Sequence, residues 1–301
     1  MRKVIISLAP VEAGLPVDKE ALAEDVVRSA AAGAAMCHLH CRRPDGSLTP
    51  DITEMADTFD RIAERTDLII QASTGGISDM DIRQRCYPLD YWRVESASLN
   101  GGTTNLGEAV YINTFEDIRY CAKAVYEREI IPEIEVFDIG MIYNIRMTQQ
   151  EVPYRNPVLY NLVFGHKGGM QPNMECLTAF RAAVPADALW GVTHYGRDNW
   201  EFLAAAIAMG AAVVRIGFED SRYLAPGRTA CANYEEVEKL AALIRAMDLE
   251  TASPEEARRI MNIPSGKRSR ILPRRQRDIK FDMPGRLTGK EMRAAICMES
   301  H

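Results

Sequence analysis

The chain has 301 residues, of which 47% are hydrophobic and 26% charged, and its formal net charge is −6. This composition is typical of a soluble globular protein with enough apolar material for a large core. The acidic balance argues against nucleic acid as the main partner, because phosphate binding needs a basic surface. The chain has no run of about 18 apolar residues, and its start leads directly into a strand-like segment. We therefore expect a cytoplasmic protein without a signal peptide or membrane association.

Strand-like and helix-like segments alternate regularly along the sequence. The predicted strands are residues 4–8, 34–39, 68–72, 93–97, 131–136, 159–164, 189–193 and 212–216. The helices predicted to follow them are residues 19–32, 53–65, 79–86, 114–128, 138–148, 173–183, 198–209 and 234–247. Eight βα units in about 250 residues match a (β/α)8 barrel. We predict an α/β fold with a catalytic TIM barrel over residues 1–264 and a C-terminal extension over residues 265–301.

Polar or glycine-rich clusters directly follow the predicted strands. They occupy residues 10–14, 38–42, 73–76, 98–103, 135–138, 165–169, 193–197 and 219–222. In a (β/α)8 barrel the carboxyl ends of the strands form one rim, and active sites lie on that rim. The clusters therefore predict an active site that is shared among several loops.

Two of the five histidines, His38 and His40, lie at the end of the second predicted strand. Side chains of a strand alternate between its faces, so these two imidazoles point the same way and suit one metal ion. The flanking Cys37 and Cys41 fall on the other face, where we expect them to be small buried residues. The seven cysteines are odd in number and contain no Cys-x-x-Cys pair, which argues against a disulfide framework or a zinc knuckle.

Closure of the barrel makes the first strand a neighbour of both the second and the eighth. Glu219, at the end of the eighth strand, can then reach the histidine pair. Two histidines, one carboxylate and an open position are typical of catalytic zinc, although iron or manganese would accept the same ligands. Only one of the adjacent Glu219 and Asp220 should face the metal. Glu135, inward on the fifth strand, is predicted to hold an imidazole by a hydrogen bond.

Four longer motifs, in this order, match one known family. They are Gly33-Ala-Ala-Met-Cys-His-Leu-His-Cys-Arg, Gln71-Ala-Ser-Thr-Gly-Gly, Pro132-Glu-Ile-Glu-Val-Phe-Asp and Val214-Arg-Ile-Gly-Phe-Glu-Asp-Ser. Over nearly all of residues 1–263 the chain resembles the β-keto acid cleavage enzymes, a group that includes 3-keto-5-aminohexanoate cleavage enzyme. Several long motifs together are far more specific than any one of them.

The resemblance implies a homo-oligomeric barrel, with a tetramer favoured, and one zinc ion held by His38, His40 and Glu219. It implies that a β-keto acid reacts with acetyl-CoA to give acetoacetate and a new acyl-CoA. The metal would polarise the ketone as a Lewis acid. The catalytic base of the family matches Asp220, steered by Arg215.

The same resemblance suggests residues that bind the substrate. Thr74 and the backbone at Gly76 and Ile77 resemble the loop that holds the substrate carboxylate, although the family commonly has a glycine in place of Ile77. Ser98 and Asn100 match polar positions that follow the fourth strand. Hydroxyls and amides at a glycine-rich turn are suitable ligands for an anion.

The chain departs from the family in two segments. Relatives have a longer connection after the first strand, and an acidic residue that binds the amino group of the aminohexanoate substrate has no equivalent in register here, Glu12 being nearby. We therefore expect a different side chain on the keto acid. Residues 265–301 form a basic tail, and we expect this tail to be solvated, to pack on a neighbouring subunit or, less favoured, to meet CoA phosphates.

The sequence leaves two other classes of function possible. One is a metal-dependent aldolase or hydrolase on the same barrel, which would need no CoA. The other is a catalytically silent metal-binding or regulatory protein, which would be unaffected by loss of Asp220. The residues do not identify which acyl group is transferred.

Overall fold

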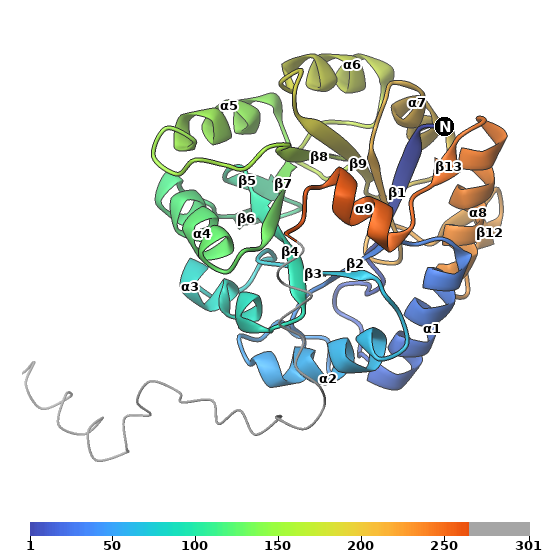
Figure 1. Cartoon of the computed structure of the whole chain (residues 1–301), viewed down its shortest axis with the longest axis horizontal. Helices are drawn as coiled ribbons and strands as arrows, with labels where there is room; N and C mark the ends of the chain where they lie inside the picture. The colour runs from blue at the N-terminus through green and yellow to red at the C-terminus, as the bar shows by residue number, and fades with distance from the viewer. Residues whose placement is uncertain (265–301) are drawn as a thin grey trace, which may run out of the picture. The chain divides into compact units, whose positions relative to one another are not determined.

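A closed ring of eight parallel strands forms the centre of the protein (Figure 1). The computed structural model describes residues 1–264. Each strand of the ring pairs with the next, and β10 returns to pair with β1. The ring consists of β1 (Lys3–Leu8), β2 (Met36–Leu39), β3 (Ile69–Ala72), β4 (Val94–Asn100), β7 (Ile131–Val136), β8 (Leu159–Phe164), β9 (Leu189–His194) and β10 (Val213–Ile216). The predicted (β/α)8 barrel is confirmed.

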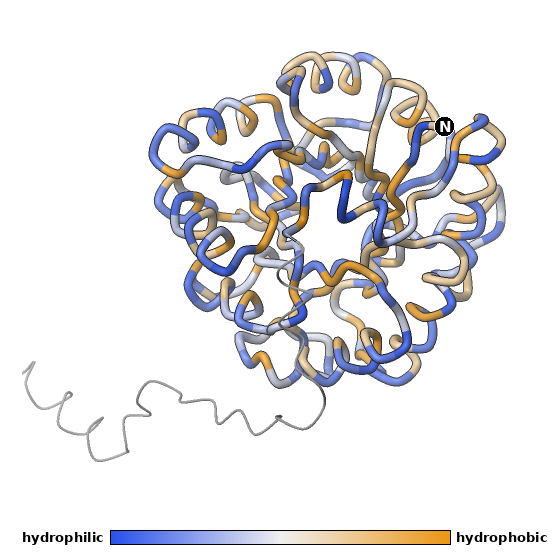
Figure 2. Tube along the Cα trace, viewed as in Figure 1, coloured by the Kyte–Doolittle hydropathy of each residue, from blue (hydrophilic) through white to orange (hydrophobic). Residues whose placement is uncertain are grey.

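The helices that connect these strands surround the ring (Figure 1). They are α1 (Lys19–Ala32), α2 (Ile52–Ala63), α3 (Ile82–Arg85), α4 (Phe115–Glu127), α5 (Ile139–Thr148), α6 (Met174–Ala183), α7 (Glu201–Ala208) and α8 (Asn233–Ala246). Figure 2 shows hydrophobic residues along the inner strands and hydrophilic residues on the outer sides of the helices. Within residues 1–264, no helix has both the length and the apolar character needed to cross a bilayer.

The third predicted helix, residues 79–86, is longer than the observed one. The chain forms one α-helical turn, α3, and then the 3-10 helix η1 (Tyr87–Asp90). Pro88 lies in the first turn of η1, and proline cannot continue an α-helix because it lacks the backbone N–H and clashes with the preceding turn. The segment that reaches β4 is therefore an α-turn joined to a 3-10 turn.

Two small antiparallel hairpins extend the loops on the rim, and the sequence analysis did not predict either of them. Strands β5 (Thr104–Leu106) and β6 (Ala109–Tyr111) pair after β4, and β11 (Tyr223–Ala225) pairs with β12 (Arg228–Thr229) after β10. Gly107 and Gly227, which both have positive φ angles, make the two turns, a conformation that glycine adopts without a steric cost. The hairpins build up the carboxyl-end rim of the barrel.

The opposite end of the barrel is closed by the last described elements. Strand β13 (Glu250–Thr251) pairs with the start of β1, and α9 (Pro254–Ile260) lies across the centre of the ring in Figure 1. An apolar cluster joins this segment to the first residues of the strands; it contains Ile5, Ala35, Met36, Ile69, Ile131, Leu159, Val213, Ala252, Ala257, Met261 and Ile263. The carboxyl end alone is left for a site inside the barrel.

The loops after β9 and β10 are joined to each other and to α8. The backbone N–H of Gly196 donates to the carbonyl of Asp220 at 2.8 Å, and the Ser221 hydroxyl donates to the carbonyl of Arg197 at 2.7 Å. Arg197 forms an ion pair of 3.1 Å with Glu236 of α8, and neither side chain is exposed. The fully enclosed pair therefore connects α8 to the loop after β9, which is bonded in turn to the loop that carries Asp220.

Replacement of Met261 by alanine should weaken the closure of the barrel. Met261 is 1% exposed within the apolar cluster, and truncation of a buried methionine costs about 2–5 kcal/mol of unfolding free energy. Urea denaturation of Met261→Ala measures this loss. The exposed Arg259, in the last turn of α9 just before Met261, serves as the control. Equal stability of Met261→Ala and Arg259→Ala would contradict the role assigned to the cluster.

Glu236 should make the stability of the protein depend on pH. Burial raises the pKa of Glu236 to about 7, although the charge of Arg197 opposes this rise. The unfolded chain ionises near the ordinary value of about 4.3, so the folded state keeps the proton longer and the free energy of unfolding falls as the pH rises toward 7. Glu236→Gln cannot ionise. Its free energy of unfolding, relative to wild type, should rise between about pH 4.3 and 7 by at most about 1.4 kcal/mol per pH unit; a constant difference in urea denaturation would exclude this titration.

Candidate active site

A cavity of about 910 Å³ opens among the loops that follow the strands at the carboxyl end of the barrel. Its wall includes the proposed metal ligands, together with Glu135, Arg215 and Asp220. The structure therefore brings together the residues predicted for metal binding and those predicted for catalysis. The chemistry-bearing side chains come from β2, β7, β10 and the loop after β10.

His38, His40 and Glu219 lie close enough to share one metal ion. Each offers a ligand atom, and these atoms lie within 4.8 Å of one another. The Nε2 atom of His38 is 3.8 Å from the Glu219 Oε1 atom, and that of His40 is 3.4 Å from it. Two imidazole nitrogens and one carboxylate oxygen suit zinc and similar divalent ions. The donor set thus fits a metal with at least one position open to substrate.

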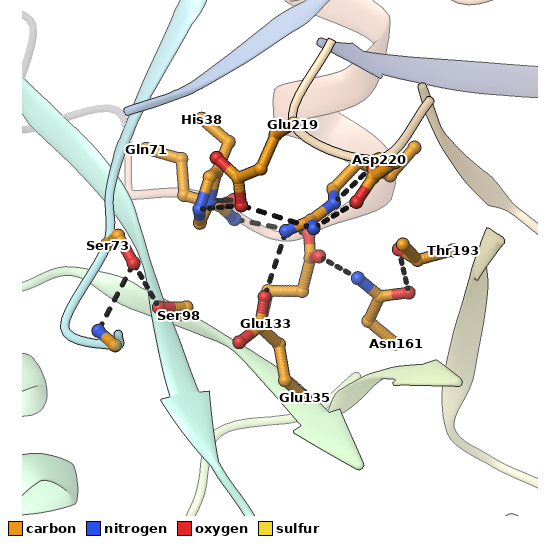
Figure 3. A network of polar contacts seen from close by, with 12 residues as sticks. His38, Gln71, Ser73, Ser98, Glu133, Glu135, Asn161, Thr193, Glu219 and Asp220 are labelled. Carbon is orange, nitrogen blue, oxygen red and sulfur yellow. Dashed lines mark hydrogen bonds and ion pairs between the residues drawn. The ribbon is translucent and has the colours of Figure 1, made fainter. Parts of the chain in front are cut away.

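The orientation of His38 is fixed by a buried polar network that the sequence analysis missed (Figure 3). The His38 Nδ1 atom lies 2.7 Å from the Oε1 atom of Gln71. Because an amide oxygen only accepts hydrogen bonds, Nδ1 carries the proton and Nε2 keeps its lone pair. Burial lowers the pKa of His38, which also favours the neutral imidazole that binds metals.

Gln71 is itself held by polar residues inside the barrel. Its Nε2 atom donates to Glu133 at 3.1 Å and to Ser96 at 3.0 Å. Asn161 donates to the other oxygen of Glu133 at 2.7 Å and accepts a hydrogen bond from Thr193 at 3.1 Å. These contacts fix which end of the Gln71 amide faces His38. The available sequence signal was a polar residue within the apolar strands Leu68-Ile-Ile-Gln-Ala and Ile131-Pro-Glu-Ile-Glu-Val.

Arg215 contacts three carboxylates, those of Glu135, Glu219 and Asp220, which are labelled in Figure 3. Its Nε and Nη2 atoms donate to the two oxygens of Asp220 at 3.0 and 2.6 Å. It also donates to Glu135 at 3.1 Å and to Glu219 at 3.3 Å. Burial alone would lower the pKa of Arg215, but these three carboxylates together raise it well above its ordinary value. Arg215 is therefore a permanent cation that orients Asp220.

Glu135 does not have the partner that the sequence analysis predicted. The prediction that it holds an imidazole is wrong for His38, whose Nδ1 atom bonds Gln71, while Glu135 accepts a hydrogen bond from Arg215. Glu135 and Gln71 both point into the barrel, but Gln71 is the residue in register with His38 where β2 pairs with β3. Burial raises the pKa of Glu135. By contrast, His40 and Arg215 hold the pKa of Glu219 well below its usual range, although burial opposes them.

The residues predicted to bind substrate divide into two groups. Gly76 and Ile77 line the cavity, as does the neighbouring Ser73. Thr74 and Ser98 are buried and bonded to each other: the Thr74 hydroxyl donates to the Ser98 carbonyl at 2.7 Å. Their hydroxyls support the loop from below. The sequence pattern could not distinguish these positions, because all of them follow strand ends.

Asn100 is also buried, and its Oδ1 atom accepts a hydrogen bond from the Gly102 N–H at 3.1 Å. Among the residues that the structure describes, its Nδ2 atom has no partner. A buried amide donor without a partner is costly, and a ligand that accepts a hydrogen bond would reduce this cost. Asn100 thus keeps a donor available beneath the site.

An aromatic wall, which the sequence analysis did not predict, lines the side of the cavity formed by the β7, β8 and β9 loops. The His166 ring stacks on Tyr195, with centroids 3.9 Å apart and planes inclined by 17°. Phe137 contacts His166 edge-on at 5.5 Å. Burial lowers the pKa of His166 to about 4, so this ring is uncharged at neutral pH. The wall therefore offers a flat, neutral surface to a bound molecule.

Glu12 is engaged outside this cavity. Its carboxylate forms an ion pair of 2.7 Å with Arg222, and both side chains are partly exposed. The following Ala13 and Gly14 line the cavity instead. The segment after β1 therefore contributes neutral atoms to the site.

Comparisons with known proteins agree on one family. The family model described as "beta-keto acid cleavage enzyme" matches residues 5–263. The chain is 36% identical to a 3-keto-5-aminohexanoate cleavage enzyme of Fusobacterium nucleatum, over 83% of this chain and 91% of that protein. It is 29% identical to a 3,5-dioxohexanoate:acetyl-CoA acetone transferase of Paraburkholderia graminis, over 87% of this chain and 96% of the relative.

A solved structure supports the fold. The ternary complex of ObcA with C4-CoA adduct and oxalate has a TM-score of 0.70 and 18% identity, over 83% of this chain and 68% of that one. This likeness concerns the fold alone. The family match over residues 5–263 includes the candidate metal ligands His38, His40 and Glu219. It also includes Arg215 and Asp220. The chain therefore belongs to the β-keto acid cleavage enzyme family.

Proposed function

We propose that this protein is a metal-dependent acyltransferase that converts a β-keto acid and acetyl-CoA into acetoacetate and a new acyl-CoA. One observation carries the proposal: Asp220, bound through both oxygens by Arg215, lies in the same cavity as the cluster His38, His40 and Glu219. Asp220, the proposed base, and the three proposed metal ligands thus line the same cavity. Family membership supports the reaction type.

The chemistry of the cluster supports zinc as its metal. His38, His40 and Glu219 would hold the ion, and Gln71 keeps the Nε2 lone pair of His38 available for it. When bound, such an ion acts as a Lewis acid that draws electron density from a carbonyl oxygen. A hydrogen atom on the carbon between two carbonyl groups of a substrate then becomes more acidic.

Asp220 is the proposed general base. The two Arg215 donors fix the direction of its carboxylate, and correct placement near the substrate carbon matters as much as basicity. Asp220 takes a proton from the carbon between the carbonyls, and that carbon attacks the acetyl-CoA thioester and displaces the CoA thiolate. The thiolate then attacks the former ketone carbon. Cleavage of the bond between this carbon and the carbon that now carries the acetyl group gives the new acyl-CoA and a carbanion, which takes the proton back from Asp220 to form acetoacetate.

The proposed substrate carries no amino group on its acyl side. Glu12 is paired with Arg222, so it offers no free carboxylate to an ammonium group. The aromatic wall formed by Phe137, His166 and Tyr195 is uncharged and accepts a neutral or apolar acyl chain. The Glu12–Arg222 pair and the uncharged wall thus favour a keto acid other than aminohexanoate.

We further propose that the protein is a cytoplasmic homo-oligomer, with a tetramer favoured by the family resemblance. The barrel forms a compact unit that ends at Pro264. The basic tail, residues 265–301, lies outside the described residues, and its packing on a neighbouring subunit stays a prediction. Size-exclusion chromatography of a chain truncated after Pro264 tests it, and an unchanged oligomer would exclude subunit packing by the tail.

Replacement of Asp220 by asparagine should lower kcat by about 10²–10⁴-fold, because asparagine cannot accept the proton. Acetoacetate formation from a panel of β-keto acids measures this loss, and the wild-type rate should saturate with acetyl-CoA. The exposed Asp187, before β9 and outside the catalytic cavity, provides the control variant Asp187→Asn. Turnover that does not need acetyl-CoA would favour an aldolase or hydrolase, and full activity of Asp220→Asn would exclude it as the base.

Removal of the metal should abolish turnover, and added zinc should restore it. Elemental analysis of the purified protein should give one zinc per chain, and His40→Ala should lose most of this metal because one of three ligands is missing. Cys41→Ala is the matched control, since Cys41 is buried in the core beside His40. Equal metal content in both variants would remove His40 from the ligand set.

A further inference from the structure

Arg42 belongs to the His-x-His-x-Arg run of this chain, but it is neither one of the proposed metal ligands nor a partner of the proposed base. It follows His40 by two residues and lines the same cavity. Its backbone forms an isolated bridge with Leu48, so the loop after β2 folds back on itself. Arg42 is thereby held in the wall of the cavity that His38, His40 and Glu219 also line.

The guanidinium of Arg42 has few protein partners. Its Nη1 atom donates to the Gly46 carbonyl at 2.9 Å, and its buried Nε atom has no hydrogen-bond partner among residues 1–264. Within the same residues, no carboxylate forms an ion pair with it, whereas Arg215 pairs with three. A partly buried guanidinium that has an unbonded N–H and no ion pair is costly, and a bound anion would reduce this cost.

The loop after β3 lies against this part of the cavity. A Cβ atom placed on Gly76 would lie 2.6 Å from Leu48 Cδ1 and 3.6 Å from the His40 ring. Gly76 therefore leaves no room for a side chain between itself and Leu48, the residue that bridges Arg42, and faces the His40 ring. The glycine-rich loop can offer only neutral N–H donors to a carboxylate, and Arg42 adds the positive charge that these donors lack.

The other cations that line the cavity are engaged elsewhere. Lys167 forms an ion pair with Glu108. Arg43 is exposed and donates to Ser47 and Leu48 of its own loop. Arg42 thus differs from Lys167 in forming no ion pair among the described residues, and from Arg43 in being partly buried.

We propose that Arg42 is a substrate-binding residue that pairs with a carboxylate of the β-keto acid. The identity of this ligand rests on the proposed function. The phosphates of acetyl-CoA are separated from its thioester by the long pantetheine arm, whereas Arg42 lies beside the metal cluster, so a carboxylate of the keto acid is the anion within reach. It is either the carboxylate that every β-keto acid carries or a second one on the acyl side.

Calorimetric titration of the zinc-loaded protein with three ligands tests the proposal. Acetylacetone has the two carbonyls but no carboxylate, acetoacetate has one carboxylate, and 3-oxoglutarate has two. Arg42→Gln should weaken acetoacetate binding about tenfold to a hundredfold, the range of a charged hydrogen bond, and leave acetylacetone binding within about twofold. Arg42→Lys should lose less affinity, because it keeps the charge. Arg61→Gln removes the same charge from an exposed position on α2 and should change nothing.

The outcomes separate the two carboxylates. A loss confined to 3-oxoglutarate would assign Arg42 to the second carboxylate, and a loss for both acids would assign it to the first. Equal weakening of acetylacetone, an unchanged affinity for both acids, or an effect only on the KM for acetyl-CoA would overturn the proposal. Zinc content and Tm of each variant report folding, and if Arg42→Gln does not fold, the same ligand ratios in Arg42→Lys decide.

This experiment also separates the inference from the proposed function, because binding needs no turnover. A wild-type chain that binds acetoacetate through Arg42 but transfers no acyl group would contradict the proposed function alone. An active chain whose Arg42→Gln variant binds all three ligands normally would contradict this inference alone. A wild-type chain that binds none of the three ligands would contradict both.

Discussion

The pairing of β10 with β1 is the constraint on which the site depends. Ser7 of β1 is in register with Arg215 of β10 on one side and with Met36 of β2 on the other. His38 on β2 and Glu219 in the loop after β10 are far apart in sequence, but they thereby come from the two sides of β1. In an open sheet with the same strand order, the width of the sheet would separate β10 from β1 and β2, so His38, His40 and Glu219 come together only because the barrel closes.

The balance of charge inside the barrel explains why a divalent cation suits this site. Arg215 supplies one positive charge to three carboxylates, Glu135, Glu219 and Asp220. Buried carboxylates are costly unless cations or hydrogen bonds compensate them. Burial raises the pKa of Glu135, which shows that Arg215 does not compensate it fully. A cation between His38, His40 and Glu219 would supply the missing charge at the end of the network where imidazoles, not further guanidinium groups, are present.

The barrel could be predicted from the sequence because apolar strands and amphipathic helices alternate with clear breaks. The His38–His40 pair and its carboxylate followed from strand alternation and closure. The Gln71–Glu133–Asn161 network could not be predicted, since its members lie on three strands and depend on which amide end faces which neighbour. For the same reason, the sequence could not distinguish Gly76, which lines the cavity, from Thr74, which is buried. Closure by α9 was missed because packing, not periodicity, identifies so short an element.

Substitutions on the two sides of the cavity should disturb the structure to different degrees. On the metal side, each of His38, Arg215 and Asp220 has partners that in turn are held by buried residues, so one substitution there disturbs several contacts. On the side proposed to hold the acyl group, the segment after β1 and the aromatic wall lie in loops. Their contacts are with residues of other loops on the rim, such as Glu12 with Arg222 or His166 with Tyr195. Loop residues can change without affecting the barrel. Such a division of constraints would allow the members of one family to keep the reaction and to differ in the keto acid.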